Sequence, residues 1–134
     1  MALAMDMAYE THLLLTRQVT VHRADGSREK RELFPKRSRW AYGTRVLQLC
    51  DELIIEIGRA NAYPTDVPAL LEKRIIKVYE ACGTAKSIAA LMNLMKRRFD
   101  VSMDHFGNWE KAYSEFMRKM TAWTDMHMKL YKAE

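Results

Sequence analysis

The residues best suited to chemistry in this sequence are the arginines and lysines gathered between positions 23 and 45. This segment contains eight basic and three acidic residues, a balance of +5 that equals the formal charge of all 134 residues. The basic residues are Arg23, Arg28, Lys30, Arg31, Lys36, Arg37, Arg39 and Arg45. Six of them are arginines, whose planar guanidinium group matches the oxygens of a phosphate in a bidentate manner. The pattern predicts a surface for a polyanion, with these eight residues as the nucleic-acid contacts.

Within this segment, the stretch FPKRSRW places cations between two aromatic rings. A solvated turn needs only the charges, and a hydrophobic core needs only the rings. We therefore expect Phe34 and Trp40 to attach the loop to a helical core. Lys36, Arg37 and Arg39 would then face the anion beside a helix N-terminus, whose free backbone N–H groups add to anion binding. A solvated charged loop without a ligand is the simpler alternative.

The side chains that most often carry catalysis or bind metals form no recognisable site in this sequence. None of the four histidines has a metal-ligand spacing to another histidine, a cysteine or a carboxylate. They are His12, His22, His105 and His127. The paired Glu-x-x-His units of a di-iron bundle are missing, and the five glycines do not form a phosphate-binding loop. We expect no enzyme, no metal and no cofactor.

The elements that must position the basic residues are helices, because glycine and proline are scarce and apolar residues recur at helical spacing. We expect helices over 3–18, over 39–61, from a cap at 65 or 66 to about 98, and from 102 onward. The apolar stripe of the second helix is Tyr42, Val46, Leu49, Leu53, Ile57 and Ala60. The stripe of the third is Leu71, Ile75, Val78, Cys82, Ala85, Ala89, Met92 and Met95.

The helix ends and the small residues give further expectations. Asn61 suits the C-cap of the second helix, Thr65 or Asp66 the N-cap of the third, and Ser102 the N-cap of the last. Gly83 permits close helix contact within the third helix or, alternatively, a mild kink. The basic residues 96–98 at the end of that helix form a second cluster, which the helix dipole also favours. The two cysteines, Cys50 and Cys82, fall inside expected helices, so we expect reduced thiols.

The last helix carries a heptad-like aromatic seam. Its members are Phe106, Trp109, Tyr113, Phe116, Met120, Trp123, His127 and Leu130, spaced alternately by three and four residues. This spacing is typical of a core-facing stripe, on which His127 would be packed and hydrogen-bonded. The rings are numerous for one small core, and interfaces are rich in aromatic residues. We therefore expect Trp109, Tyr113, Phe116 and Trp123 in the core or at a subunit contact of a homo-oligomer.

Residues 19–33 break the helical pattern. Val19 and Val21 alternate with polar residues, and Asp25-Gly26 is typical of a two-residue hairpin turn. Either a β-hairpin or a loop occupies this segment, inserted between the first and second helices. We predict an all-α protein, an antiparallel four-helix bundle in one domain over 1–134.

The N-terminal sequence MALAMDMAYE lacks the positive region and apolar stretch of a signal peptide. No run approaches the roughly 20 apolar residues that a membrane span needs. We expect a cytoplasmic protein that does not bind a membrane.

Three stretches resemble a known family. FPKRSRWAYGTRVLQLCDELIIEI, LLEKRIIKVYEACGTAKSI and YSEFMRKMTAWTDM resemble the accessory variability determinants, small four-helix bundles encoded beside reverse transcriptases in diversity-generating retroelements. The resemblance covers roughly 34–128. Its most specific part is the run Phe34, Pro35, Lys36, Arg39, Trp40, Gly43, Arg45 and Val46, and Trp123 also fits. The related 23S rRNA intervening-sequence proteins share the bundle, but their IPxNIAEG-like segment is missing from the second helix.

The resemblance implies a homopentameric, barrel-like assembly with a basic surface. Its partners would be a reverse transcriptase and the template RNA or cDNA, and it would assist mutagenic retrohoming without catalysing it. In the family the first helix runs nearly to the Phe-Pro pair, whereas here extra residues around Asp25 and Gly26 intervene. Two other functions remain open: a 23S rRNA intervening-sequence-type protein, and a protein-interaction scaffold whose basic segment docks on an acidic protein.

Overall fold

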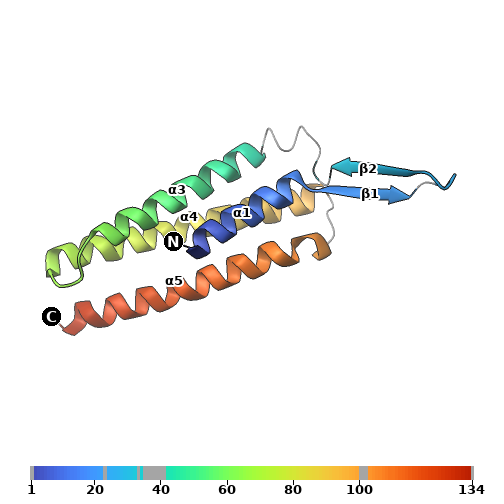
Figure 1. The fold of residues 1–134 in the computed structure, drawn as a ribbon. Helices are drawn as coiled ribbons and strands as arrows, with labels where there is room; N and C mark the ends of the chain where they lie inside the picture. The colour runs from blue at the N-terminus through green and yellow to red at the C-terminus, as the bar shows by residue number, and fades with distance from the viewer. Residues whose placement is uncertain (1, 23, 33, 35–41, 100–102, 134) are drawn as a thin grey trace.

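The computed structural model describes residues 2–22, 24–32, 34, 42–99 and 103–133, with the backbone alone for 18–22, 29–32 and 103–104. In chain order the elements are α1 (Ala2–Thr16), β1 (Gln18–His22), β2 (Arg28–Glu32), α3 (Thr44–Ala62), α4 (Pro68–Arg98), the 3-10 turn η2 (Met103–Phe106) and α5 (Gly107–Ala133). Successive α-helices run in opposite directions along one bundle (Figure 1). The predicted all-α, antiparallel four-helix bundle is therefore confirmed.

The helices differ greatly in length. α1 has 15 residues and α4 has 31, so at 1.5 Å per residue they extend over about 22 Å and about 46 Å. α1 begins near the middle of the bundle and runs to the end that carries the β-hairpin (Figure 1). Half of the bundle is consequently covered by three helices rather than four.

The core consists of the predicted stripes. All members of the α3 stripe are buried except the half-buried Tyr42, and all members of the α4 stripe are buried except the half-buried Cys82. On α1 a polar residue joins the core, because the fully buried Thr11 hydroxyl donates to Met7 O at 2.8 Å and accepts from Trp109 Nε1 at 2.8 Å. This pairing satisfies an indole N–H inside the bundle and links α1 to α5.

Two predicted helix caps are wrong. α3 continues through Asn61 to Ala62, and its C-cap is Tyr63, whose N–H donates to Ala60 O at 3.2 Å. α4 begins after Val67, which has an extended backbone (φ −111°, ψ 114°), and Pro68 occupies the first turn. Proline disfavours helical geometry in the residue before it, so Val67 becomes the N-cap and no side-chain oxygen caps the helix. The predicted cap at Ser102 lies outside the described residues.

The prediction that Gly83 permits close helix contact is also wrong. Gly83 is exposed, and a Cβ atom placed there would meet nothing within 4 Å. The start of the last helix differs as well, because η2 holds residues 103–106 and α5 proper begins at Gly107.

Of the two alternatives for residues 19–33, the structure has the hairpin. β1 and β2 pair antiparallel, from Gln18 opposite Glu32 to His22 opposite Arg28. The predicted two-residue turn is replaced by the longer connection 23–27. There Asp25 Oδ1 accepts from the Ser27 backbone N–H at 2.9 Å and from its hydroxyl at 2.6 Å, and Gly26 has a φ of +85°. Glycine adopts this left-handed conformation without steric cost.

Candidate nucleic-acid interface

A cluster of aromatic rings closes the hairpin end of the bundle. Phe34 is completely buried, and its ring lies edge-on to Phe99 and Phe106 at centroid distances of 6.3 and 6.2 Å. Tyr42 contacts Phe99 at 6.4 Å in a similar geometry. The predicted attachment of the segment through Phe34 is therefore found, whereas Trp40 lies outside the described residues. The chain is anchored immediately before the basic stretch that begins at Lys36.

Several cations surround this aromatic cluster, and aromatic rings or backbone carbonyls hold them in place. The Arg98 guanidinium lies over the Tyr42 ring, 5.6 Å from its centroid, and donates to the Tyr42 hydroxyl. Lys96 Nζ lies 5.4 Å from the Phe106 ring centroid. Arg17 Nη1 donates to His105 O at 3.1 Å. Cations fixed in this way lose less side-chain entropy when an anion binds.

The predicted phosphate contacts that the structure describes lie in two places. Arg28 is exposed at the start of β2, and Lys30 and Arg31 follow on the same strand. Arg45 lies in the first turn of α3. The other four predicted contacts, Arg23, Lys36, Arg37 and Arg39, lie outside the described residues.

Acidic partners neutralise this end only in part. Arg45 Nη1 lies 3.7 Å from Glu52 Oε1, with both side chains more than half exposed, and Lys96 Nζ lies 3.6 Å from Glu110 Oε1. The exposed Arg45–Glu52 pair contributes at most about 1 kcal/mol, so a phosphate can compete for Arg45. Arg28 and Arg97 have no ion-pair partner among the residues whose side chains are described.

The structure joins the two basic clusters of the sequence. In an antiparallel bundle the C-terminus of α4 and the N-terminus of α3 lie at the same end, so residues 96–98 and Arg45 lie at the end from which the hairpin extends (Figure 1). Arg17 was missed from the sequence. It directly follows α1, and its place at a helix C-terminus, which the dipole makes attractive to cations, was the available signal.

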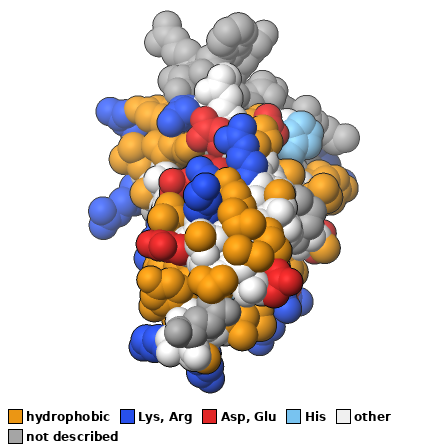
Figure 2. Space-filling view, turned by 90° about the vertical axis from the view of Figure 1, so that its left-hand side faces the viewer, with side chains coloured by type: hydrophobic (Ala, Val, Ile, Leu, Met, Phe, Trp, Pro, Cys, Tyr) orange, Lys and Arg blue, Asp and Glu red, His pale blue; other side chains and the backbone are white. Residues whose placement is uncertain are grey.

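The opposite end of the bundle has a different character. There hydrophobic side chains lie among both basic and acidic ones, so charges of both signs are interspersed on this face (Figure 2). The contrast with the hairpin end supplies internal controls for charge substitutions.

The aromatic seam of α5 contributes mainly to the core. Trp109 and Phe116 are buried, whereas Tyr113 and Trp123 are half-buried. Trp109 also stacks on Tyr113 with a centroid distance of 5.4 Å and an interplanar angle of 6°. The last member of the seam, Leu130, is exposed.

His127 is buried and hydrogen-bonded, as expected. Its Nε2 accepts from Arg74 Nε at 2.8 Å, so the ring is neutral with its proton on Nδ1. Burial, followed by the positive charge of Arg74, lowers the pKa of His127, and an interaction with the Trp123 backbone opposes these effects. Arg74 extends from α4 to the end of α3, where Nη1 donates to Tyr63 O at 2.8 Å. Its guanidinium also lies 5.6 Å from the Trp123 ring centroid.

The cysteines and the other titratable groups form no site within the described ranges. Cys50 and Cys82 are free thiols, and burial, with the Asp51 charge adding to it, raises the pKa of Cys50 to about 11. Such a thiol is a poor nucleophile at neutral pH. Among the described residues, no three or more His, Cys, Asp or Glu side chains converge as metal ligands would.

The described part of the chain also contains no helix of the length and hydrophobicity needed to cross a membrane. No protein-family model, curated protein or solved structure matches this chain.

Proposed function

We propose that this chain is a non-catalytic nucleic-acid-binding protein and that it acts as an accessory to the reverse transcriptase of a diversity-generating retroelement. The observation that carries the proposal is the gathering of Arg17, Arg97 and Arg98 at the end of the bundle to which Phe34 is anchored, with Arg28 on the hairpin that extends from that end. The specific assignment to a retroelement rests on the sequence resemblance. Template RNA or cDNA is the polyanion, and the reverse transcriptase is the protein partner.

The basic end suits the phosphate backbone rather than the edges of bases. Arginine forks bind phosphate oxygens bidentately, and each phosphate that is neutralised releases counterions, which favours binding at low salt. Lys36, Arg37 and Arg39 follow Phe34 in the chain by two to five positions and add to the predicted contacts. Because phosphate contacts carry no sequence information, we expect binding with little sequence preference.

The test is the salt dependence of binding to a mixed-sequence single-stranded RNA. The affinity is measured by fluorescence anisotropy between about 50 and 300 mM salt, the range over which phosphate-driven binding weakens strongly. Neutralising about five phosphates predicts a slope of log affinity against log salt near −3.5, since each contributes about 0.7 on a single strand. The double substitution Arg97→Gln/Arg98→Gln should make that slope shallower by about 1.4.

Lys129→Gln/Lys132→Gln is the matched control. It removes the same charge from the last turns of α5, at the opposite end of the bundle, and should leave the slope unchanged. Equal effects of the two double variants would mean that net charge, not the basic end, drives binding. If no RNA binds even at the lowest salt, the chain is better explained as a scaffold whose basic end docks on an acidic protein.

We also propose that the chain self-associates, as a pentamer by resemblance. α1 supports this part, because it is apolar on both faces: Met5 and Tyr9 are 51% and 62% exposed, while Met7 and Leu14 are in the core. Exposed apolar residues that recur on one face of a helix are typical of a protein–protein contact. Light scattering should give five times the mass of one chain, and Met5→Glu/Tyr9→Glu should give a smaller assembly. A monomeric parent protein would contradict this part of the proposal.

A further inference from the structure

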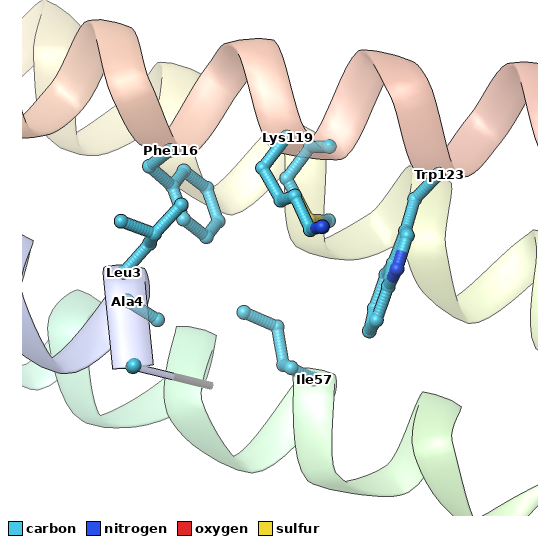
Figure 3. A pocket seen from close by; sticks show the side chains of 8 residues that line it. Leu3, Ala4, Ile57, Phe116, Lys119 and Trp123 are labelled. Carbon is cyan, nitrogen blue, oxygen red and sulfur yellow. The ribbon is translucent and has the colours of Figure 1, made fainter.

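The short α1 leaves a hollow in the half of the bundle that it does not reach. The hollow lies at the N-terminal end of α1, against the middle of α3 and α5, and has a volume of about 160 Å³. In Figure 3, Leu3 and Ala4 stand on one side of it, Ile57 lies below, and the Phe116 and Trp123 rings stand at either side above. Three helices therefore provide its walls.

The lining is apolar apart from the Lys119 amine and the indole N–H of Trp123. Lys119 lies on α5 between Phe116 and Trp123, and its side chain extends over the hollow (Figure 3). Lys119 is exposed and forms no ion pair with any residue whose side chain is described. The site thus offers an apolar interior with a single positive charge at its mouth.

The size of the hollow limits what can enter it. An engineered apolar cavity of about 150 Å³ stays dry and binds benzene, so a ring of that size fits a hollow of 160 Å³. Water gains few hydrogen bonds from such walls, and its displacement by apolar atoms is favourable. A long acyl chain or a bulky multi-ring cofactor exceeds this volume.

We propose that this hollow is a binding site for a small molecule with a benzene-sized apolar group and one carboxylate. The ring packs between Ile57, Phe116 and Trp123, and the carboxylate pairs with Lys119. The site is distinct from the basic end of the bundle and does not depend on nucleic-acid binding.

The experiment uses 3-phenylpropionate as the probe and 3-phenylpropanamide as its neutral counterpart. Binding to the full chain is followed by NMR through the indole N–H of Trp123. We expect a dissociation constant on the order of 1 mM for the carboxylate, as for a fragment-sized ligand. The amide should bind about two- to fivefold more weakly, the range expected for one exposed ion pair.

Two variants make the assignment specific. Ala2 is an exposed residue that lines the hollow, so Ala2→Phe fills the space without disturbing a buried position and should weaken both probes at least tenfold. Lys119→Gln should reduce carboxylate binding to that of the amide, while Lys129→Gln, on the same helix but outside the hollow, should change neither. Since Lys119 is exposed, its variant keeps the fold even if Ala2→Phe does not.

The proposal is overturned if neither probe shifts the Trp123 signal, or if filling the hollow leaves binding intact. Equal affinities of carboxylate and amide for the parent protein would equally overturn it, because the assigned role of Lys119 would then be wrong.

Discussion

Replacing Arg74 with methionine tests how much the far end of the bundle depends on one side chain. Arg74 joins three helices: it donates to His127 Nε2 on α5 at 2.8 Å and to Tyr63 O after α3 at 2.8 Å. Its longer contacts reach Ala60 O at 3.3 Å and Asn61 Oδ1 at 3.3 Å. Methionine keeps much of the apolar stem but can donate none of these hydrogen bonds.

The cost follows from which partners water can reach. His127 is completely buried, so its Nε2 would be left without a donor, which costs about 1–3 kcal/mol. Tyr63 is a half-buried residue in the turn after α3, where water can replace the lost donor to its carbonyl, so the lost bond costs about 1 kcal/mol. We therefore expect Arg74→Met to lower the free energy of unfolding by about 2–4 kcal/mol. For a chain of 134 residues, whose entropy of unfolding is about 0.28 kcal/mol/K, the melting temperature should fall by about 7–14 °C.

Thermal and urea unfolding measure the effect, with Lys77→Met as the control. Lys77 lies on the same helix and pairs with Glu80 at 3.1 Å near the surface, so its loss should cost less than about 1 kcal/mol. In a double-mutant cycle, Arg74→Met should cost at least about 1 kcal/mol less when His127 is already leucine. Costs that simply add, or an Arg74 variant no less stable than the Lys77 control, would refute the reasoning.

Three further predictions concern stability. Burial and the arginine partner lower the pKa of His127 in the folded chain. As the pH falls through the ordinary histidine pKa of 6.5, His127 is therefore protonated in the unfolded chain but stays neutral in the folded one. Stability should thus fall as the pH drops from 7.5 to 5.5, and His127→Leu should flatten this part of the denaturant-midpoint profile. Gly83→Ala should raise the free energy of unfolding, measured in urea, by about 0.5–1 kcal/mol, since the position is helical and has room for a methyl group. A destabilised variant would mean that the added methyl group meets a neighbouring residue. Thr11→Val should lower the free energy of unfolding by about 1–3 kcal/mol, because it leaves the Trp109 N–H unpaired. The control Thr121→Val, at an exposed position, should lower it by less, and thermal melting measures both variants.

The regular parts of the fold could be predicted because helical periodicity is local. The stripes from Val46 to Ala60 and from Leu71 to Met95 name the core of α3 and α4 almost residue by residue. The spacing of three and four in α5 likewise identified Phe116 and His127 as buried. Short turns between amphipathic helices then favour an antiparallel bundle.

The helix ends and the glycine could not be predicted as well, because their conformations depend on competition between neighbours. Pro68 imposed an extended backbone on Val67 and so removed both candidate caps before it. Gly83 looked like a contact point in the sequence, yet no described residue of another helix lies within 4 Å of a Cβ atom placed there. Periodicity identifies the face of a helix but not the distance to the next one.

The candidate interface was predictable in composition but not in extent. The charge excess between positions 23 and 45 is visible in the sequence, and the burial of Phe34 agrees with its expected role as an anchor. That Arg17 and residues 96–98 belong to the same end follows only from the antiparallel packing, which brings distant helix termini together.

By itself, the sequence determined which faces are apolar, where charge accumulates and that the chain is helical, since each is a property of residues close together along it. The tertiary structure alone decided that the end of α4 lies at the same end of the bundle as the hairpin, that Arg74 reaches His127 across 53 positions, and that α1 leaves a hollow between α3 and α5. These features depend on how long each helix is relative to the others and on which side chains meet across them. Local propensity carries no information about such distances, because they arise only when the helices pack.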